Sequence, residues 1–337
     1  DVLLGSQRLL LGGQVNKTLF YGRSYSYLNG SYQQFFVGRL TASGALDQSF
    51  GNHGLVLLAT DQLERMSIST IEEAGSNQAY VAGYGMETNG DQVGYVVRLN
   101  QNGSLDSGFA NGVFALAPAA AGSYEESVAR QLQIRADGRL LVGAEYHSYA
   151  NYSTDVVLLQ LNTDGSVDTG NFGSSLPGYT VFSEIDPNAV IVEELSQMKL
   201  DPVDGSLVIA GQYKLSTDPQ LYIARFSDTG VLMNTTNSPS DAFGQSGQGY
   251  SLINLIDNSN NPTSHFEYLN LLDFDAGRNP VLALASYSEG ADQHYLYRLQ
   301  QNGGIDTSFN YGSPRLYNSF SNSIPANLKI NQLHVDA

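Results

Sequence analysis

Short apolar runs, separated by polar turns that often contain glycine, recur along the whole chain. Five of these runs align with one another and begin at Phe35, Tyr95, Val157, Tyr222 and Tyr295. Each follows another apolar run, over 18–26, 79–85, 139–146, 206–213 and 280–287. The runs are short, rich in β-branched and aromatic residues, and bounded by turn residues, which is typical of strands. The pattern therefore predicts an all-β repeat protein.

One column of the alignment is a glycine that follows a small polar residue, a combination typical of turns because glycine reaches positive φ without steric cost. An apolar residue and then Asp come a few positions later, with Met233 replacing the Asp in the fourth copy, and a Phe follows. We expect each copy to tuck its Phe under a tight loop. These structural repeat residues are Gly44, Gly103, Gly165, Gly230 and Gly303; Asp47, Asp106, Asp168 and Asp306; and Phe50, Phe109, Phe172, Phe243 and Phe309.

Each copy contains four predicted antiparallel strands in about sixty residues. A lone sheet of this size cannot bury both faces, whereas sheets packed around an axis can, and that arrangement also protects their edges. We therefore expect one repeat domain over 1–337, a β-propeller of four-stranded blades, with a β-sandwich array as the alternative. The expected units are 1–60, 61–119, 120–184, 185–256 and 257–319. Residues 320–337 would begin a further unit or close the ring, and we favour a chain that is part of a longer protein.

The segments over 39–51, 98–112 and 298–312 run from a strand Arg through a polar-Gly turn to Leu or Ile, Asp and Phe. They resemble the bacterial delta-60 repeat family, and the resemblance extends over nearly the whole chain. The third and fourth copies depart from it, since Gln160 replaces the Arg and 231–244 carries an insertion. The resemblance implies a propeller and a secreted or surface-exposed bacterial protein. It implies no reaction and supplies no catalytic residues.

Composition narrows the function classes. The net charge of −17 disfavours nucleic acid as a partner, because phosphate backbones need clustered Lys and Arg. No apolar run reaches the ~18 residues of a membrane span, so we expect no membrane insertion. Cys is absent, which removes disulfides and thiolate chemistry and favours a secreted, extracellular protein.

Two sets of residues could bind a ligand. The turn with Asn162, Asp164 and Asp168 resembles a Ca²⁺ loop, although an Asp that caps backbone N–H groups gives the same pattern; beyond this weak Ca²⁺ candidate, we expect no cofactor or metal. Loops between the second and third strands of a unit combine Tyr with Ser, Asn and Gly, a composition that binding loops use. This speculative ligand-binding face comprises Tyr25, Tyr27, Tyr32, Tyr149 and Tyr152.

The sequence leaves open the roles of two groups of charged side chains, one within the repeat columns and one outside them. The column Arg39, Arg98, Arg225 and Arg298 could line a channel, or each Arg could pair with a neighbouring acid, such as the repeat Asp. Glu125, Glu126, Glu193 and Glu194 lie off the columns and are the candidate acids of an enzyme, but the sequence does not place them together.

With no catalytic set in the repeats, the primary expectation is a non-enzymatic extracellular binding or structural protein, such as an adhesin-like module or a subunit of a surface layer or filament. Its partners would be proteins or glycans, and it could form a homo-oligomer or polymer. The alternative is a secreted polysaccharide-active enzyme with paired acidic residues in the propeller channel.

Overall fold

The computed structural model describes residues 8–9, 17–26, 32–58, 60, 63–88, 90–117, 124–150, 152–183, 192–215, 218–244, 246–253, 266–288 and 291–309. They belong to two compact units, the first formed by 1–150 and 157–168 and the second by 151–156 and 169–337. The described part begins with a short strand, β1 (Arg8–Leu9), whereas residues 320–337, which were expected to begin a further unit or close the ring, lie outside the described residues.

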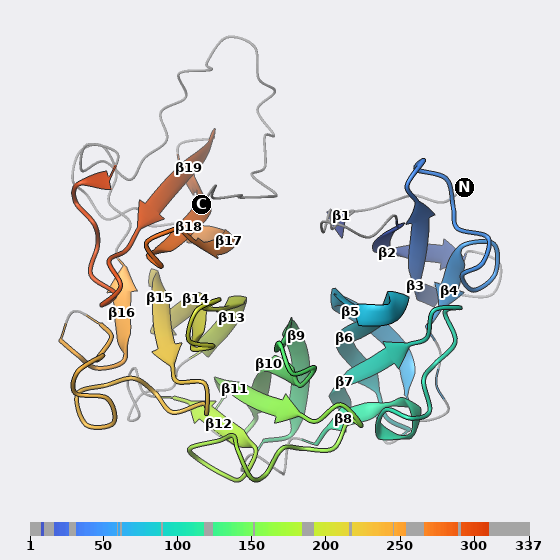
Figure 1. Ribbon diagram of the computed structural model, residues 1–337, viewed down its shortest axis with the longest axis horizontal. Helices are drawn as coiled ribbons and strands as arrows, with labels where there is room; N and C mark the ends of the chain where they lie inside the picture. Colours follow the sequence, from blue (N-terminus) through green and yellow to red (C-terminus); the bar gives the residue numbers. More distant parts are fainter. Residues whose placement is uncertain are drawn as a thin grey trace. The chain divides into compact units, whose positions relative to one another are not determined.

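Strands form nearly all the regular structure of the first unit, as the sequence predicts (Figure 1). The sheet β1-β2-β3-β4 is followed by β5-β6-β7-β8 and by β9-β10, which continues into β11 (Ser153–Leu161), a strand that the unit boundary crosses. Two single 3-10 turns, η1 (Gly75–Asn77) and η2 (Ala110–Gly112), connect strands. The other strands are β2 (Lys17–Ser26), β3 (Tyr32–Thr41), β4 (Leu55–Leu57), β5 (Glu64–Ala74), β6 (Gln78–Met86), β7 (Gln92–Leu99), β8 (Phe114–Leu116), β9 (Glu126–Ile134) and β10 (Leu140–Ser148).

The second unit repeats this organisation in the fourth and fifth sheets. β13-β14-β15-β16 is antiparallel and four-stranded, β17-β18-β19 has three described strands, and β12 pairs with β11. One parallel pairing, between Thr154 and Val192, connects β11 with β13. The strands are β12 (Tyr179–Phe182), β13 (Val192–Leu200), β14 (Leu207–Leu215), β15 (Asp218–Phe226), β16 (Tyr250–Ile253), β17 (Phe266–Phe274), β18 (Pro280–Ser288) and β19 (Ala291–Arg298).

Neighbouring sheets within a unit bury their apolar faces against each other. In the first unit, Val37 and Phe50 of the first sheet share a core with Ile71 and Val81 of the second. In the second unit, Ile223 and Phe243 of the fourth sheet pack with Leu272 and Leu282 of the fifth. A buried side chain of this size contributes about 1.5–3 kcal/mol, which a single sheet exposed on both faces would forgo. The all-β fold of packed antiparallel sheets is therefore confirmed, while a single domain with the expected unit boundaries stays a prediction.

The turn glycine of one repeat packs against the Phe loop of the repeat before it. All five glycines have φ between 79° and 84°. The N–H of Gly51, just after Phe50, donates to the Asn102 carbonyl, just before Gly103, at 2.8 Å. The same bond joins Ala110 to Asp164 at 2.8 Å, Gly173 to Thr229 at 3.0 Å and Gly244 to Asn302 at 2.8 Å. We call this recurring contact the repeat joint.

The arginine column is paired, which answers one of the two open questions. Nε of Arg39, Arg98 and Arg298 lies 2.8 Å from the repeat Asp of its own copy. The guanidinium of Arg39 also lies 4.5 Å from the centre of the Phe50 ring, and Arg298 is 4.8 Å from Phe309. The Arg, Asp and Phe of the motif thus form one stacked group, whose ion pair is buried in the first copy.

The two degenerate copies keep an ion pair by other means. In the third, Asp168 accepts hydrogen bonds from Gln160 and from Arg139, both at 2.7 Å. In the fourth, where Met233 replaces the acid, Arg225 binds Asp201 from the turn after β13 at 2.6 Å. The ion pair therefore recurs although the sequence motif does not.

Candidate functional site

The five tyrosines of the proposed ligand-binding face lie in two different hairpins. Tyr25 and Tyr32 are at the ends of β2 and β3, where Tyr25 pairs with Gln33 and Tyr32 with Ser26, and Tyr27 lies outside the described residues. Tyr149 and Tyr152 follow β10 and are 55% and 77% exposed. Only Tyr149 and Tyr152 have described side chains, so a single tyrosine face stays a prediction.

Tyr149, in the first unit, lies beside acidic side chains. Its backbone N–H donates to Oε2 of Glu125 at 2.8 Å. The pKa of its phenol is raised, chiefly by a hydrogen bond with the side chain of Glu126 and further by the negative charges of Glu125 and Asp91. Glu125 directly precedes β9 and Glu126 is its first residue, so the pairing of β9 with β10 brings both to Tyr149. Asp91 precedes β7 of the neighbouring sheet.

This arrangement has clear chemical limits. Because its pKa is raised, the Tyr149 hydroxyl keeps its proton at neutral pH and can donate but cannot act as a base. Glu125 accepts the backbone N–H of Tyr149, and Glu126 binds its side chain. An exposed ring beside two carboxylates suits a ligand that offers an apolar face and hydroxyl donors.

The other two candidate acids, Glu193 and Glu194, belong to the second unit, apart from Tyr149. Glu194 of β13 binds Nζ of Lys214 at 2.6 Å, and the neighbouring Glu193 is buried, with its backbone opposite Tyr213. Of the four acids that the sequence singles out, the structure places Glu125 and Glu126 beside Tyr149. The sequence missed Asp91, whose closeness to Tyr149 depends on the packing of neighbouring sheets.

The side chains of the candidate Ca²⁺ loop bind other groups of the protein. Nδ2 of Asn162 donates to Ser166 at 3.0 Å, Oδ1 of Asp164 accepts from the Ser166 N–H at 2.9 Å, and Asp168 binds Gln160 and Arg139. Within the described part of the chain, no three His, Asp or Glu side chains form a group that could hold a metal ion. No helix there has the length and apolar character of a membrane span.

Two segments, residues 78–109 and 135–170, match the family model described as a domain of unknown function (DUF5122) beta-propeller. Both include a repeat turn and the strand before it. The match agrees with the predicted β-propeller type, while the more specific delta-60 assignment stays a prediction. No curated protein matches the sequence.

Solved structures with a similar arrangement of strands include carbohydrate-active enzymes. An endo-arabinase from Bacteroides thetaiotaomicron VPI-5482 has a TM-score of 0.43 and 9% identity, with 89% of this chain and 96% of that chain covered. A levansucrase variant of B. megaterium has a TM-score of 0.44 and 9% identity, covering 86% and 80%. An ulvan lyase, described as a new family of polysaccharide lyase, has a TM-score of 0.47 and 10% identity, covering 88% and 68%.

The comparison contradicts the primary functional expectation. The similar structures just described are named as enzymes of polysaccharide chemistry, which agrees with the alternative expectation and not with a non-enzymatic adhesin-like or filament-forming protein. At this identity the likeness concerns the fold and assigns no site residue.

Proposed function

We propose that this protein hydrolyses a neutral polysaccharide, with Glu125 and Glu126 as its two carboxylates and Tyr149 as the ring that positions a sugar. The observation that carries the proposal is the binding of both carboxylates to opposite ends of one exposed tyrosine, Glu125 at its N–H and Glu126 at its side chain. Glycoside hydrolysis generally uses a pair of acidic residues, one as acid and the other as base or nucleophile.

Charge and protonation select among polysaccharide reactions. The net charge of −17 and the acids around Tyr149 repel uronic or sulfated polymers, so a neutral glycan fits better. The raised pKa of Tyr149 argues against a tyrosine-catalysed elimination, which would need a phenolate near neutral pH. Hydrolysis needs one carboxylate as acid and one as base or nucleophile, and Glu125 and Glu126 together supply these two roles.

The test is the release of reducing ends from a panel of neutral and uronic polysaccharides by the whole chain. We expect activity on neutral polymers, a loss of about 10²–10⁴-fold in kcat for Glu125→Gln and for Glu126→Gln, and a smaller loss for Tyr149→Phe. Asp241→Asn, which removes an exposed carboxylate in the second unit, is the matched control. The proposal fails if no polymer is cleaved, or if the two Glu variants are as active as the control.

We also propose a secreted or surface location in a bacterium, with glycans as partners, and a propeller whose blades are delta-60 repeats. The absence of Cys and the recurring Arg, Gly, Asp and Phe columns support these proposals. Fractionation of the native host tests the location, and a determined structure tests the closed ring of blades.

A further inference from the structure

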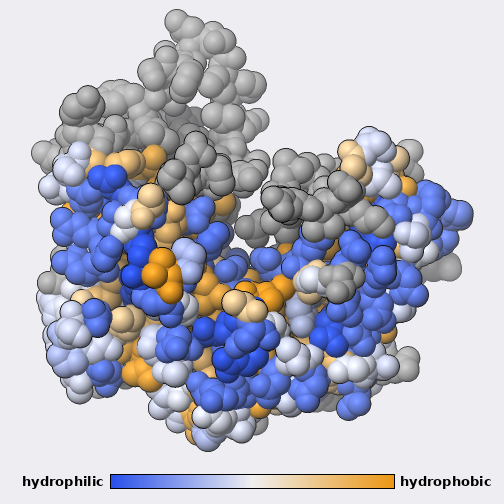
Figure 2. All heavy atoms as spheres, in the orientation of Figure 1, coloured by the Kyte–Doolittle hydropathy of each residue, from blue (hydrophilic) through white to orange (hydrophobic). Residues whose placement is uncertain are grey.

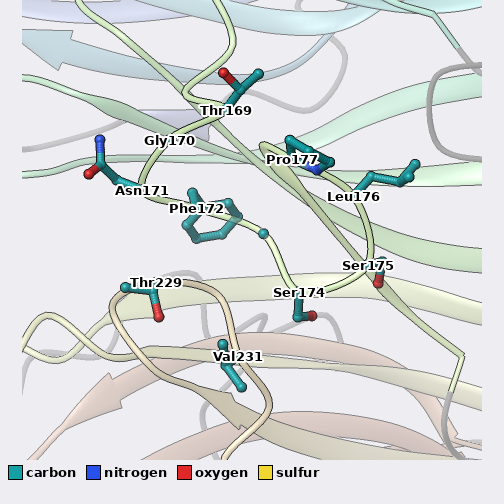
Figure 3. A pocket seen from close by; sticks show the side chains of 11 residues that line it. Thr169, Gly170, Asn171, Phe172, Ser174, Ser175, Leu176, Pro177, Thr229 and Val231 are labelled. Carbon is teal, nitrogen blue, oxygen red and sulfur yellow. The ribbon is translucent and has the colours of Figure 1, made fainter.

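A hollow of about 560 Å³ lies at the repeat joint of the second unit (Figure 3). The loop over 169–177, which follows β11, forms one side, and Thr229 and Val231, from the turn after β15, form the other. None of the residues around it is charged, although the chain carries a net charge of −17. The visible face of the described surface is mostly hydrophilic (Figure 2).

Hydrogen bonds and close packing connect the two sides of this hollow. Gly173 donates its N–H to the Thr229 carbonyl at 3.0 Å, which ties one side to the other. Phe172, only 3% exposed, packs under Gly230, where a Cβ would come within 2.7 Å of its ring. Thr180 donates to the Gly230 carbonyl at 2.7 Å. A rigid site spends little binding energy on ordering itself.

The chemistry of the lining matches an uncharged, hydroxyl-rich ligand. Ser175 accepts the Val181 N–H at 3.0 Å, which leaves its own hydroxyl hydrogen to donate. Leu176, 41% exposed, and Pro177 supply an apolar wall beside these polar groups. A sugar ring offers hydroxyls at its edge and C–H groups on its face, and the volume falls within the ~300–1,000 Å³ of small-molecule sites.

The same feature recurs in the first unit. A hollow of about 670 Å³ lies at the joint between the first two repeats and is again uncharged, with amide and hydroxyl side chains around it. Its lining residues are Ser49, Gln78, Asn100, Gln101, Asn102 and Ser104. Each unit therefore has an uncharged hollow at a repeat joint, and each hollow can bind one segment of a polymer.

We propose that these two hollows, the joint grooves, bind neutral oligosaccharide segments. They lie apart from Tyr149 in sequence and use no carboxylate, so the inference goes beyond the proposed hydrolytic site while sharing its class of ligand. Binding at two grooves strengthens the capture of a polymer over that of a short oligosaccharide, because the second contact is intramolecular.

The test is affinity electrophoresis of the whole chain in gels containing arabinan, xylan or dextran. We expect at least one polymer to retard the protein. Leu176→Asp and Gln101→Glu each place a charge in one groove, and we expect each to weaken binding about tenfold, with a larger loss in the double variant. Val203→Asp is the matched control, because Val203 is 70% exposed in the second unit and lies outside both grooves.

The outcomes separate this inference from the proposed function. No retardation by any of the three polymers, or wild-type retardation of the double variant, overturns the joint grooves as binding sites. Circular dichroism shows whether each variant remains folded, and Val203→Asp shows the effect of surface charge alone. Binding that persists in Glu126→Gln while hydrolysis is lost supports both proposals, whereas binding without any hydrolysis by the wild type overturns only the catalytic one.

Discussion

The repeat joint makes a quantitative prediction about its turn glycines. Gly44 and Gly165 occupy the same position of the same turn in the first unit, with φ of 79° and 82°. A Cβ at Gly44 would meet nothing within 4 Å. At Gly165 it would lie 2.7 Å from the backbone nitrogen of Ala110 and 2.8 Å from its Cβ. The two glycines therefore share a backbone conformation, but only Gly165 packs against the loop of another repeat.

Alanine substitution separates these two costs. Placing a non-glycine residue in the left-handed region costs about 1–2 kcal/mol, and we expect Gly44→Ala to lose that much stability. Gly165→Ala adds a clash with backbone that cannot swing aside, and overpacking of this kind costs about 1–3 kcal/mol. The expected total at Gly165 is about 2–5 kcal/mol, so the difference between the variants reports the joint alone.

Urea denaturation followed by far-UV circular dichroism suits this comparison, because the chain has no tryptophan. Asparagine tolerates positive φ, so Gly44→Asn should be nearly neutral while Gly165→Asn stays destabilising. Equal losses at the two positions, within about 0.5 kcal/mol, would show that the joint does not constrain the turn. The m-value must remain constant for the free energies to be compared.

Two further predictions concern the ion pairs and acids of the repeats. Arg39→Met leaves the buried Asp47 without its ion-pair partner and should lower the free energy of unfolding by about 3–5 kcal/mol in urea denaturation, since the two side chains are 2% and 8% exposed. Arg98→Met should cost clearly less, because that ion pair is 15% and 17% exposed. Equal losses of stability in the two variants would contradict this prediction. Hydrogen bonds from Ser166 lower the pKa of Asp164. The stabilising effect of this carboxylate is therefore complete above its unfolded pKa and is lost as the pH falls below about 4. The urea midpoint should fall less at acidic pH in Asp164→Asn than in the wild type, and an unchanged pH profile would refute the assignment.

The repeat motif could be predicted from the sequence because each of its residues acts locally. The glycine sets a left-handed turn, and the Asp caps the next turn by accepting the N–H two residues further on, as Asp47 does from Ser49. The Arg lies eight residues before its Asp, as in the Arg39–Asp47 pair at 2.8 Å. Such signals depend on short spacings, which the chain itself fixes. The strands around them follow from short apolar runs for the same reason.

The candidate site was accessible only in part. Tyr149 and the pair Glu125 and Glu126 stood out by composition, but nothing in their spacing shows that both acids contact one tyrosine. That contact depends on how the strand after 124 pairs with the strand before 149.

The sequence by itself determined the repeating turn, the strands that flank it and the residues that stack there, since these are set by neighbours along the chain. Tertiary structure decided which residues replace the missing motif partners in the third and fourth copies: Arg139 pairs with Asp168, and Asp201 pairs with Arg225. It also decided which turn glycines pack against the loop of another repeat and where hollows with an uncharged lining form. These properties depend on packing between sheets, which brings together residues whose separation in sequence carries no signal.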